Sequence, residues 1–190
     1  MGLLAPLRGS DHLIPSAARD QALEFDALFS ELFEREFPRL FRYLDRLSGE
    51  PDLAADLAQE AFVRLNDRAE MPDHPPLWLI TVALNLFRNV KTTRSRRRRL
   101  LTATRLEATL ADSPPNPAES VQAEETRAQV RHVIDQLEDR DRQLLLLRAE
   151  GYSYRDMATV LGLNENSVGT LLARAKRAFR EAYQEDPNAS

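Results

Sequence analysis

Residues 151–179 read GYSYRDMATVLGLNENSVGTLLARAKRAF, and this stretch determines the fold of the C-terminal half of the chain. Ser153, followed three residues later by Asp156, forms a capping box that predicts the start of a helix at Tyr154. Gly162 stands where the chain must turn sharply, and Asn164 can cap the helix that follows. The stretch therefore predicts two helices joined by a tight turn.

The apolar residues of this stretch fall where two crossing helices would touch. Ala158 is small at the expected crossing, and Leu163, Val168 and Leu172 supply contacts that fix it. The second helix carries cations that can neutralise phosphates, namely Arg174, Lys176, Arg177 and Arg180. A helical hairpin with solvated arginines is the alternative. Because the cap, the small residue, the turn glycine and the apolar positions coincide in register, we interpret the stretch as a DNA-binding helix-turn-helix.

Helical periodicity also extends upstream of this unit. Apolar residues at three-and-four spacing predict helices over 25–47, from Pro51 through Leu65, and from Leu77 beyond Asn89. Residues 68–76 hold three prolines and are expected to be a loop. After a Pro-, Ser- and acid-rich segment, further helices are predicted at about 121–137, 139–149, 154–161 and 165–183. No strand-like alternation appears.

The predicted fold is all-α, with two small helical domains joined by a flexible linker. The expected boundaries are a mobile N-terminal tail (1–24), a first domain (25–100), the linker (101–120), a second domain with the helix-turn-helix (121–184) and a C-terminal tail (185–190).

Charge is distributed unevenly along the chain. The formal net charge is -4, yet residues 88–105 hold 8 basic side chains and no acidic one, whereas residues 1–80 hold 8 basic and 15 acidic ones. The centre of the basic run is NVKTTRSRRRRL, residues 89–100. Such a distribution suits a protein with at least two kinds of partner, one of them polyanionic.

Several function classes are excluded by what the sequence lacks. The 190 residues include no cysteine, and the three histidines lie far apart, so we expect no disulfide, no metal site and no cofactor. There is no Gly-rich phosphate loop and no nucleophile motif, so no enzymatic activity is expected. No apolar run approaches the roughly 20 residues of a membrane span and no signal peptide is apparent, so we expect a cytoplasmic protein without membrane insertion.

Two polar clusters stand out in the first domain. Asp56, Gln59 and Glu60 form an acidic stripe on one helix face. From composition alone, the favoured interpretation is that this stripe is only a solvent-exposed surface. On the next helix, Asn85, Arg88 and Asn89 share a face and can contact base edges and phosphates. The residues expected on the buried face of that helix are Leu79, Val82, Leu86 and Val90, while Phe62 and Leu65 of the preceding helix are expected in the core.

Three segments together resemble bacterial extracytoplasmic-function (ECF) RNA polymerase sigma factors. The sequence LEDRDRQLLLLRAEGYSYRDMATVLGLNENSVGTLLARAKRAF (137–179) is similar to the domain of that family that binds the promoter -35 element. DLAQEAFVRL (56–65) resembles the helix that grips the clamp helices of RNA polymerase, and WLITVALNLFRN (78–89) resembles the helix that takes the -10 element. The resemblance covers residues 25–183, with both halves in the family's order.

The resemblance implies a non-catalytic alternative sigma factor with three kinds of contact. Core polymerase, through its clamp helices and flap, would contact Asp56, Gln59 and Glu60. The separated -10 strand would contact Asn85, Arg88 and Asn89, and the loop 68–76 would capture one flipped base. The -35 contacts would come from Asn166, Ser167, Gly169, Thr170, Ala173, Arg174 and Arg177. An anti-sigma factor is a further partner that the resemblance implies.

The basic run is then expected to follow the DNA backbone. Its contacts would come from Lys91, Arg94, Arg96, Arg97, Arg98 and Arg99, with release of counterions. A nuclear localisation signal or a solvated linker are the alternatives for this run. For the whole chain, the rivals are a stand-alone helix-turn-helix regulator that binds a palindrome as a dimer and a module that only sequesters a protein partner.

The recognition helix departs from the family pattern at its centre. Gly169, Thr170, Leu171 and Ala173 stand where the family often has longer or more polar side chains. Either the helix approaches the major groove closely, with the Thr170 methyl and Ala173 touching thymine methyls, or Arg174 and Arg177 mainly hold phosphates. We favour close approach, because Gly169 costs roughly 1 kcal/mol of helix propensity that something should offset.

Overall fold

Helices account for all the regular secondary structure in the computed structural model, which describes the backbone of residues 16–102 and 121–185. The first three helices are α1 (Ser16–Ser48), α2 (Pro51–Arg68) and α3 (Pro75–Thr102). The remaining four are α4 (Val121–Gln136), α5 (Asp139–Ala149), α6 (Tyr154–Leu161) and α7 (Glu165–Glu185). In the part of the chain so described, no helix has the length and apolar character needed to cross a membrane. The predicted all-α class is confirmed.

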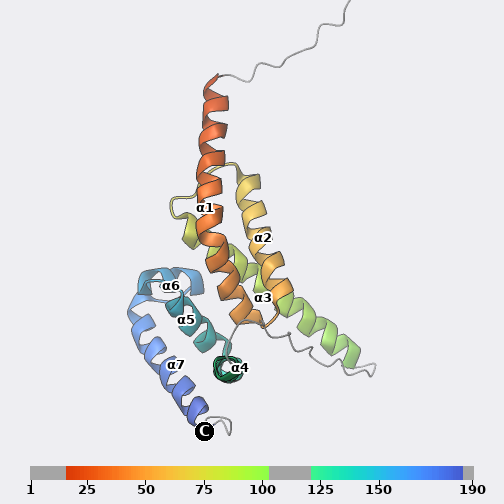
Figure 1. The fold of residues 1–190 in the computed structure, drawn as a ribbon, viewed down its shortest axis with the longest axis vertical. Helices are drawn as coiled ribbons and strands as arrows, with labels where there is room; N and C mark the ends of the chain where they lie inside the picture. The colour runs from red at the N-terminus through yellow and green to blue at the C-terminus, as the bar shows by residue number, and fades with distance from the viewer. Residues whose placement is uncertain (1–15, 103–120, 186–190) are drawn as a thin grey trace, which may run out of the picture.

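The first domain is built on a helical hairpin of α1 and α2, which α3 crosses (Figure 1). The chain reverses at Gly49, whose φ of +71° is a conformation that glycine adopts without steric cost. Pro51 then starts α2, because a proline at the first helical position gives up no intrahelical hydrogen bond. The core holds Tyr43, Leu44, Leu57, Ala58, Ala61, Phe62, Leu65, Ile80 and Leu84, so Phe62 and Leu65 are core residues as predicted.

Two boundaries of the first domain differ from the prediction. Helix α1 begins at Ser16, so residues 16–24, expected in a mobile tail, are helical. This segment lacks a clear apolar stripe, but its Ala, Arg, Gln and Leu residues are strong helix formers. At the other end, α3 extends through Thr102, so residues 101 and 102, expected in the linker, are helical too. At the C-terminus, α7 extends to Glu185, the first residue of the predicted tail. Residues 1–15, 103–120 and 186–190, the rest of the predicted tails and linker, lie outside the described residues.

The buried face of α3 is rotated from the predicted one. Leu79 is buried as expected, but Val82, Leu86 and Val90 are only half-buried. The fully covered positions are Leu79, Ile80, Ala83 and Leu84. The helix is apolar on a broad arc here, so periodicity alone does not identify which part of that arc α1 and α2 cover.

In the second domain, α4 to α7 form a small bundle that contains the predicted helix-turn-helix. Ser153 and Asp156 make the reciprocal capping box at the start of α6, and Gly162 ends α6 with a φ of +65°. Helices α5 and α6 both pack on α7. The buried side chains at these contacts include Val133, Leu144, Leu147, Met157, Ala158, Val168 and Leu172. The ends of α5 and α6 agree with the sequence prediction residue for residue.

The two domains are in contact. Helix α5 lies against α1, and α6 lies against α3 (Figure 1). A single cluster of buried apolar residues runs from the first domain into the second and includes Tyr43 and Leu84 as well as Tyr152. The helix-turn-helix is therefore packed on the same side of the first domain where α1 and α3 lie next to each other.

Candidate nucleic-acid interface

The N-terminus of α7 is shaped by a cap that the sequence predicted. Asn164 Oδ1 accepts a hydrogen bond from the backbone N–H of Asn166, at 2.9 Å. The hydroxyl of Ser167 donates to the carbonyl of Asn164, at 2.7 Å. Asn166 is exposed, whereas Ser167 is half-buried, so Ser167 contributes to the turn and leaves Asn166 as the freer polar side chain.

The predicted -35 residues share one face of α7. Thr170, Ala173 and Arg177 are exposed along that face, and Gly169 is half-buried beside the ring of Tyr154. A Cβ at Gly169 would lie 3.5 Å from Cε2 of Tyr154, which is an ordinary van der Waals contact. The packing of the chain therefore does not require a glycine at this position.

Arg174 is engaged within the domain. Its Nη2 atom donates to Asp141 Oδ1 of α5 at 2.9 Å and lies 3.6 Å from Glu138 Oε2. The hydrogen bond and the negative charge of Asp141 raise the pKa of the guanidinium. Asp141 is buried, and sequence reasoning did not single it out because an acid in the first turn of a helix is common. Arg174 thus links α5 to α7 while half of its side chain stays exposed.

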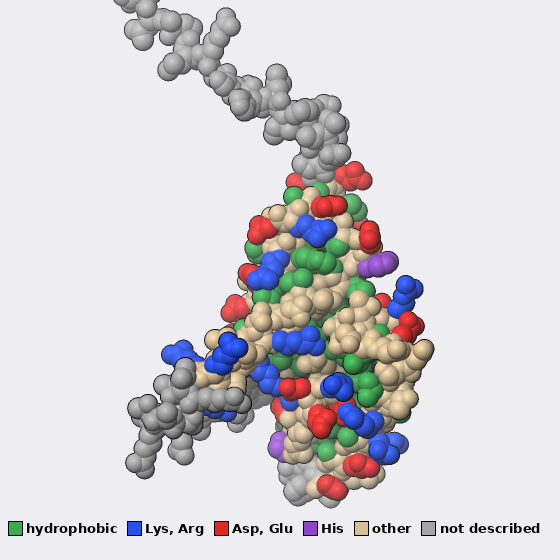
Figure 2. Space-filling model, turned by 180° about the vertical axis from the view of Figure 1, so that it is seen from behind, with side chains coloured by type: hydrophobic (Ala, Val, Ile, Leu, Met, Phe, Trp, Pro, Cys, Tyr) green, Lys and Arg blue, Asp and Glu red, His purple; other side chains and the backbone are tan. Residues whose placement is uncertain are grey.

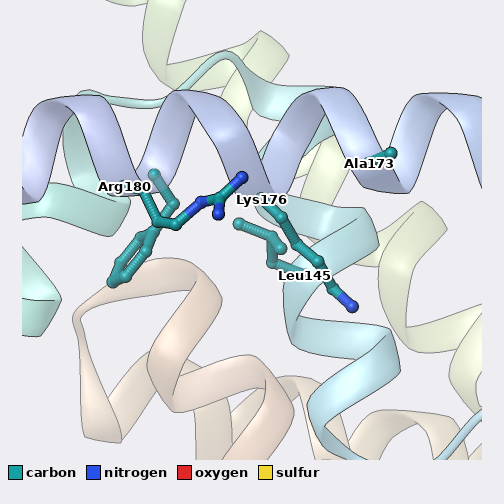
Figure 3. Close-up of a pocket in the computed structure, with 5 residues that line it drawn as sticks. Leu145, Ala173, Lys176 and Arg180 are labelled. Carbon is teal, nitrogen blue, oxygen red and sulfur yellow. The ribbon is translucent and has the colours of Figure 1, made fainter.

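Two other cations of α7 border a shallow cavity of about 400 Å³ between α5 and α7. The cavity is also lined by the apolar residues Leu145, Ala173 and Phe179. Figure 3 shows Lys176 and Arg180 extending from α7, with Leu145 of α5 near them. These long side chains lie beside the predicted -35 face, where their charges add to its positive potential.

On α3, the predicted -10 residues also lie on one exposed face, but that face is partly covered. Arg88 Nη1 contacts Asn85 Oδ1 at 3.4 Å, and Arg88 Nη2 donates to Gln143 Oε1 of α5 at 3.2 Å. Asn89 is exposed. One turn further along, Lys91 forms an ion pair with Asp139, also of α5. The second domain therefore contacts the -10 face directly, which no sequence pattern predicted.

The basic run forms the C-terminal part of α3, which projects away from the other helices (Figure 1). Figure 2 shows its Lys and Arg side chains on the projecting arm. The exposed side chains of the run are Lys91, Arg94, Arg96, Arg97 and Arg98. The side chain of Arg99 lies outside the described residues. Arg94 pairs with Glu50, and this hydrogen bond raises the pKa of the guanidinium. A projecting cationic helix suits contact with a phosphate backbone.

The loop before α3 spans residues 69–74, shorter than the predicted 68–76 because α2 continues through Arg68 and α3 begins at Pro75. Ala69 adopts a left-handed conformation at the end of α2, with a φ of +53°. Asp73 and His74 are exposed, and Met71 packs against the core. The loop thus presents polar side chains next to the first turn of the -10 helix.

The acidic stripe lies on the outer face of α2. Asp56, Gln59 and Glu60 are all exposed, and Glu60 pairs with Arg64 at 2.8 Å. Beside Gln59, α1 and α2 form a shallow cavity of about 330 Å³ lined by Phe29, Phe33, Phe62 and Val63. An exposed acidic stripe next to an apolar hollow is typical of a surface that binds a protein.

Helix α1 is joined to the segment at the end of α5 by hydrogen bonds, ion pairs and a cation–π contact. Arg39 Nε donates to the backbone carbonyl of Glu150 at 3.0 Å, and its guanidinium lies 4.1 Å from the ring centre of Tyr152. The carboxylate of Glu150 pairs with Arg42 at 3.3 Å and with Arg46 at 3.0 Å. Burial raises the pKa of Tyr152 to about 12, with Arg39 opposing that shift, so its ring is neutral at physiological pH.

These features define a two-domain helical protein with a helix-turn-helix and a basic helix on one chain, a class that binds DNA. Residues 32–99 match Sigma-70 region 2, and residues 127–179 match Sigma-70, region 4. The chain belongs to the family of ECF RNA polymerase sigma factors. Members of this family direct transcription initiation as regulators that bind DNA and are not catalytic enzymes.

The relatives match over most of the chain. It is 35% identical over 145 residues to the ECF RNA polymerase sigma factor EcfG of Rhodopseudomonas palustris, with 74% of this chain and 75% of that protein covered. It is 27% identical over 198 residues to the ECF RNA polymerase sigma factor SigE of Mycolicibacterium smegmatis, with 95% and 74% covered. The fold is similar to that of the sigma factor RpoE of Bartonella quintana, solved in complex with the anti-sigma factor NepR, with a TM-score of 0.65, 23% identity and 83% and 98% of the chains covered.

Proposed function

We propose that this sigma factor binds core RNA polymerase through Asp56, Gln59 and Glu60, recognises the -10 and -35 promoter elements with α3 and α7, and assists opening of the duplex. The observation that carries this proposal is the arrangement of two separate polar helix faces, one in each family region. A single chain that reads two different spaced elements needs two such faces, whereas a dimer reads two copies of one half-site with one face on each chain.

At the -10 element, Asn85 and Asn89 have amide groups that can donate to and accept from base edges, while Arg88 can hold a phosphate. The loop 69–74 lies directly before this helix, and its exposed Asp73 and His74 are the polar groups near a captured base. The arm from Lys91 to Arg99 then follows the DNA backbone without reading its sequence.

At the -35 element, Asn166, Thr170, Ala173 and Arg177 face the major groove. Close approach at Gly169 remains our preferred arrangement, because its neighbour Tyr154 leaves room for a Cβ and packing offers no other reason for a glycine. Arg174 would act with one edge of its guanidinium on Asp141 and the other on a phosphate.

The protein NepR in the Bartonella quintana structure is an anti-sigma factor bound to a chain of similar fold. By analogy, we include an anti-sigma factor among the proposed partners, together with core RNA polymerase and promoter DNA. This part of the proposal depends on fold similarity alone.

Co-purification with core RNA polymerase tests the proposal. A tagged full-length chain should retain core polymerase and should bind promoter duplex tightly only as part of that complex. Tight, polymerase-independent binding of a palindromic duplex by a dimer would instead favour the stand-alone regulator. Retention of some other protein, with no dependence on DNA, would favour the sequestering module.

A further inference from the structure

One face of the first domain gathers cations from two helices. Arg39, Arg42 and Arg46 lie at i, i+3 and i+7 on α1, which places them on the same side of that helix. Arg88 and Lys91 lie one turn apart on α3. All five contact residues between Asp139 and Tyr152, so α5 and the segment after it lie across both helices.

The covering segment offers an oxygen acceptor to each of these cations. From its N-terminus to its C-terminus, the carboxylate of Asp139 meets Lys91, the amide oxygen of Gln143 meets Arg88, and the carboxylate of Glu150 meets Arg42 and Arg46. The 11 residues of α5 extend about 16 Å along the helix axis. Two carboxylates and one neutral amide oxygen are therefore spaced along the segment, and a nucleic-acid backbone also presents a row of oxygen acceptors, with a negative charge on each phosphate.

The arginines of α1 divide into two kinds. Arg39 is held by Glu36 as well as by the Glu150 carbonyl and the Tyr152 ring, so it belongs to the packing between the domains. Arg42 and Arg46 are about half exposed, at 52% and 47%, while the Glu150 carboxylate that they share is only 6% exposed. Two half-exposed guanidinium groups that converge on one carboxylate of the chain have the chemistry to bind another anion, such as a phosphate, in its place.

We propose that Arg42 and Arg46 extend the -10 DNA-binding surface of α3 onto α1, and that Glu150 and Asp139 occupy this surface until single-stranded promoter DNA displaces them. The proposal rests on the proposed function, since it takes Arg88 and Lys91 as DNA contacts. It assigns two further nucleic-acid-binding residues and makes the second domain a competitor of the DNA.

The proposed competition needs both the ion pairs and the apolar contact between the domains to be released. The pair of Lys91 with Asp139 joins half-exposed side chains, so it contributes little and weakens as salt rises, whereas the Glu150 carboxylate is buried and depends more on its two arginines. A DNA strand that brings several phosphates to the same face gains from release of its counterions. The same cations can therefore hold the domains together in the free chain and contact DNA once α5 has moved.

The test measures binding of a fluorescein-labelled, 20-nucleotide single-stranded DNA of mixed sequence to the full chain, without polymerase, by fluorescence anisotropy over a range of salt. The double variant Asp139→Asn, Glu150→Gln removes both competing carboxylates. We expect it to bind the DNA about tenfold more tightly than the unaltered chain. The matched control Glu31→Gln, Glu34→Gln changes the net charge equally at exposed positions of α1 but leaves the ion pairs between the domains in place, and its affinity should stay near the original.

A second pair of variants tests the arginines. Adding Arg42→Ala and Arg46→Ala to the double variant should abolish the increase in affinity and lower the log-log salt slope by about 1.4, the value for two phosphate contacts on a single strand. Adding Arg35→Ala and Arg64→Ala, an equal charge change on arginines that pair only within the first domain, should leave the increase intact. An increase that persists without Arg42 and Arg46 would overturn their assignment.

The separation of the domains is measured in parallel. Because the chain has no cysteine, Asp67→Cys and Gln184→Cys can carry a donor and acceptor dye on α2 and α7. The Asp139→Asn, Glu150→Gln variant should show a longer distance between them. An unchanged affinity, whether or not this distance changes, would overturn the competition. Core binding and promoter-directed transcription test the proposed function separately. A failure of the proposed function can therefore be distinguished from a failure of the proposed competition between α5 and DNA.

Discussion

The two helices expected to contact promoter DNA, α3 and α7, differ in how their polar faces are engaged. On α3, Arg88 and Lys91 are bonded to Gln143 and Asp139 of the second domain. On α7, Thr170, Ala173 and Arg177 point outward and are exposed. Composition and periodicity can thus identify a polar helix face without showing whether the folded chain leaves it open. If α3 contacts DNA as proposed, Arg88 and Lys91 become available only when their bonds to α5 are released, whereas the exposed side chains of α7 require no such change.

The largest expected effect concerns the surface that would bring polymerase to the chain. Charge reversal by Asp56→Lys and Glu60→Lys should weaken core binding at least about 100-fold, because clusters of contact residues dominate interface energies. Both side chains are exposed, so the free energy of unfolding should change by only about 0.5 kcal/mol. Pull-down assays and thermal unfolding measure the two quantities, and Glu24→Lys with Asp26→Lys, in the first half of α1, is the matched control. Undiminished core binding by the double variant would remove this assignment.

The next effect separates the arm of α3 from its base-reading face. Replacing Arg96–Arg99 with alanine should lower the log-log salt slope of promoter complexes by about 0.9 for each duplex phosphate that no longer has an arginine beside it. Affinity should fall similarly for all sequences, and the preferred -10 sequence should barely change. Replacing Asn85 and Asn89 with alanine should change the preferred -10 sequence and leave the salt slope nearly unaltered. An unaltered salt slope for the arm variant would show that the run is a solvated helix end.

A smaller effect is expected at the centre of the recognition helix. Gly169→Ala adds a Cβ at an ordinary contact distance from Tyr154, so it should stabilise α7 by up to about 1 kcal/mol. If α7 approaches the groove closely, the same substitution should lower affinity for the -35 duplex, Gly169→Arg should alter the selected -35 sequence, and Thr170→Ser should weaken binding where a thymine is contacted. Selection from a randomised -35 library provides the measurement. One weak consensus, common to the original chain and all three variants, would leave the phosphate-holding arrangement.

The smallest effect distinguishes the two arginines of α7. Arg174→Ala leaves the buried carboxylate of Asp141 without its main partner, so the midpoint of thermal unfolding should fall by a few degrees. Arg177 pairs only loosely with Glu181 on the surface, and Arg177→Ala should leave that midpoint unchanged while weakening DNA binding. Equal midpoints for both variants would mean that Arg174 is not a structural link.

The sequence predicted most of the local structure because its signals are local. The capping box at Ser153, the left-handed turn at Gly162 and the proline at position 51 each fix the end of a helix within a few residues. The start of α1 could not be predicted in this way, because strong helix formers without an apolar face give little periodic signal. The predicted buried face of α3 was only partly correct: Leu79 is buried and Val82, Leu86 and Val90 pack against the core, but Ile80, Ala83 and Leu84 are buried more deeply because several neighbouring positions on that helix are apolar.

The contacts of the candidate site were less predictable. Each hydrogen bond of Arg88 to Gln143, Arg174 to Asp141 and Arg42 to Glu150 joins residues more than 30 positions apart in sequence. Ion pairs at such separations depend on how helices pack, and a single sequence carries no signal for them. The roles of these residues in DNA and polymerase binding remain predictions that the experiments above address.

Run-off transcription is the decisive measurement of whether this chain directs polymerase to promoters with two recognition elements. Core RNA polymerase, with and without the chain, is incubated with a library of genomic fragments, and the transcript starts are mapped. We predict new transcripts that require the chain and share two upstream motifs, near -10 and -35. Substitutions on α3 should change the first motif and substitutions on α7 the second. Transcripts that do not depend on the chain, or starts that share no such pair of motifs, would contradict the proposed function.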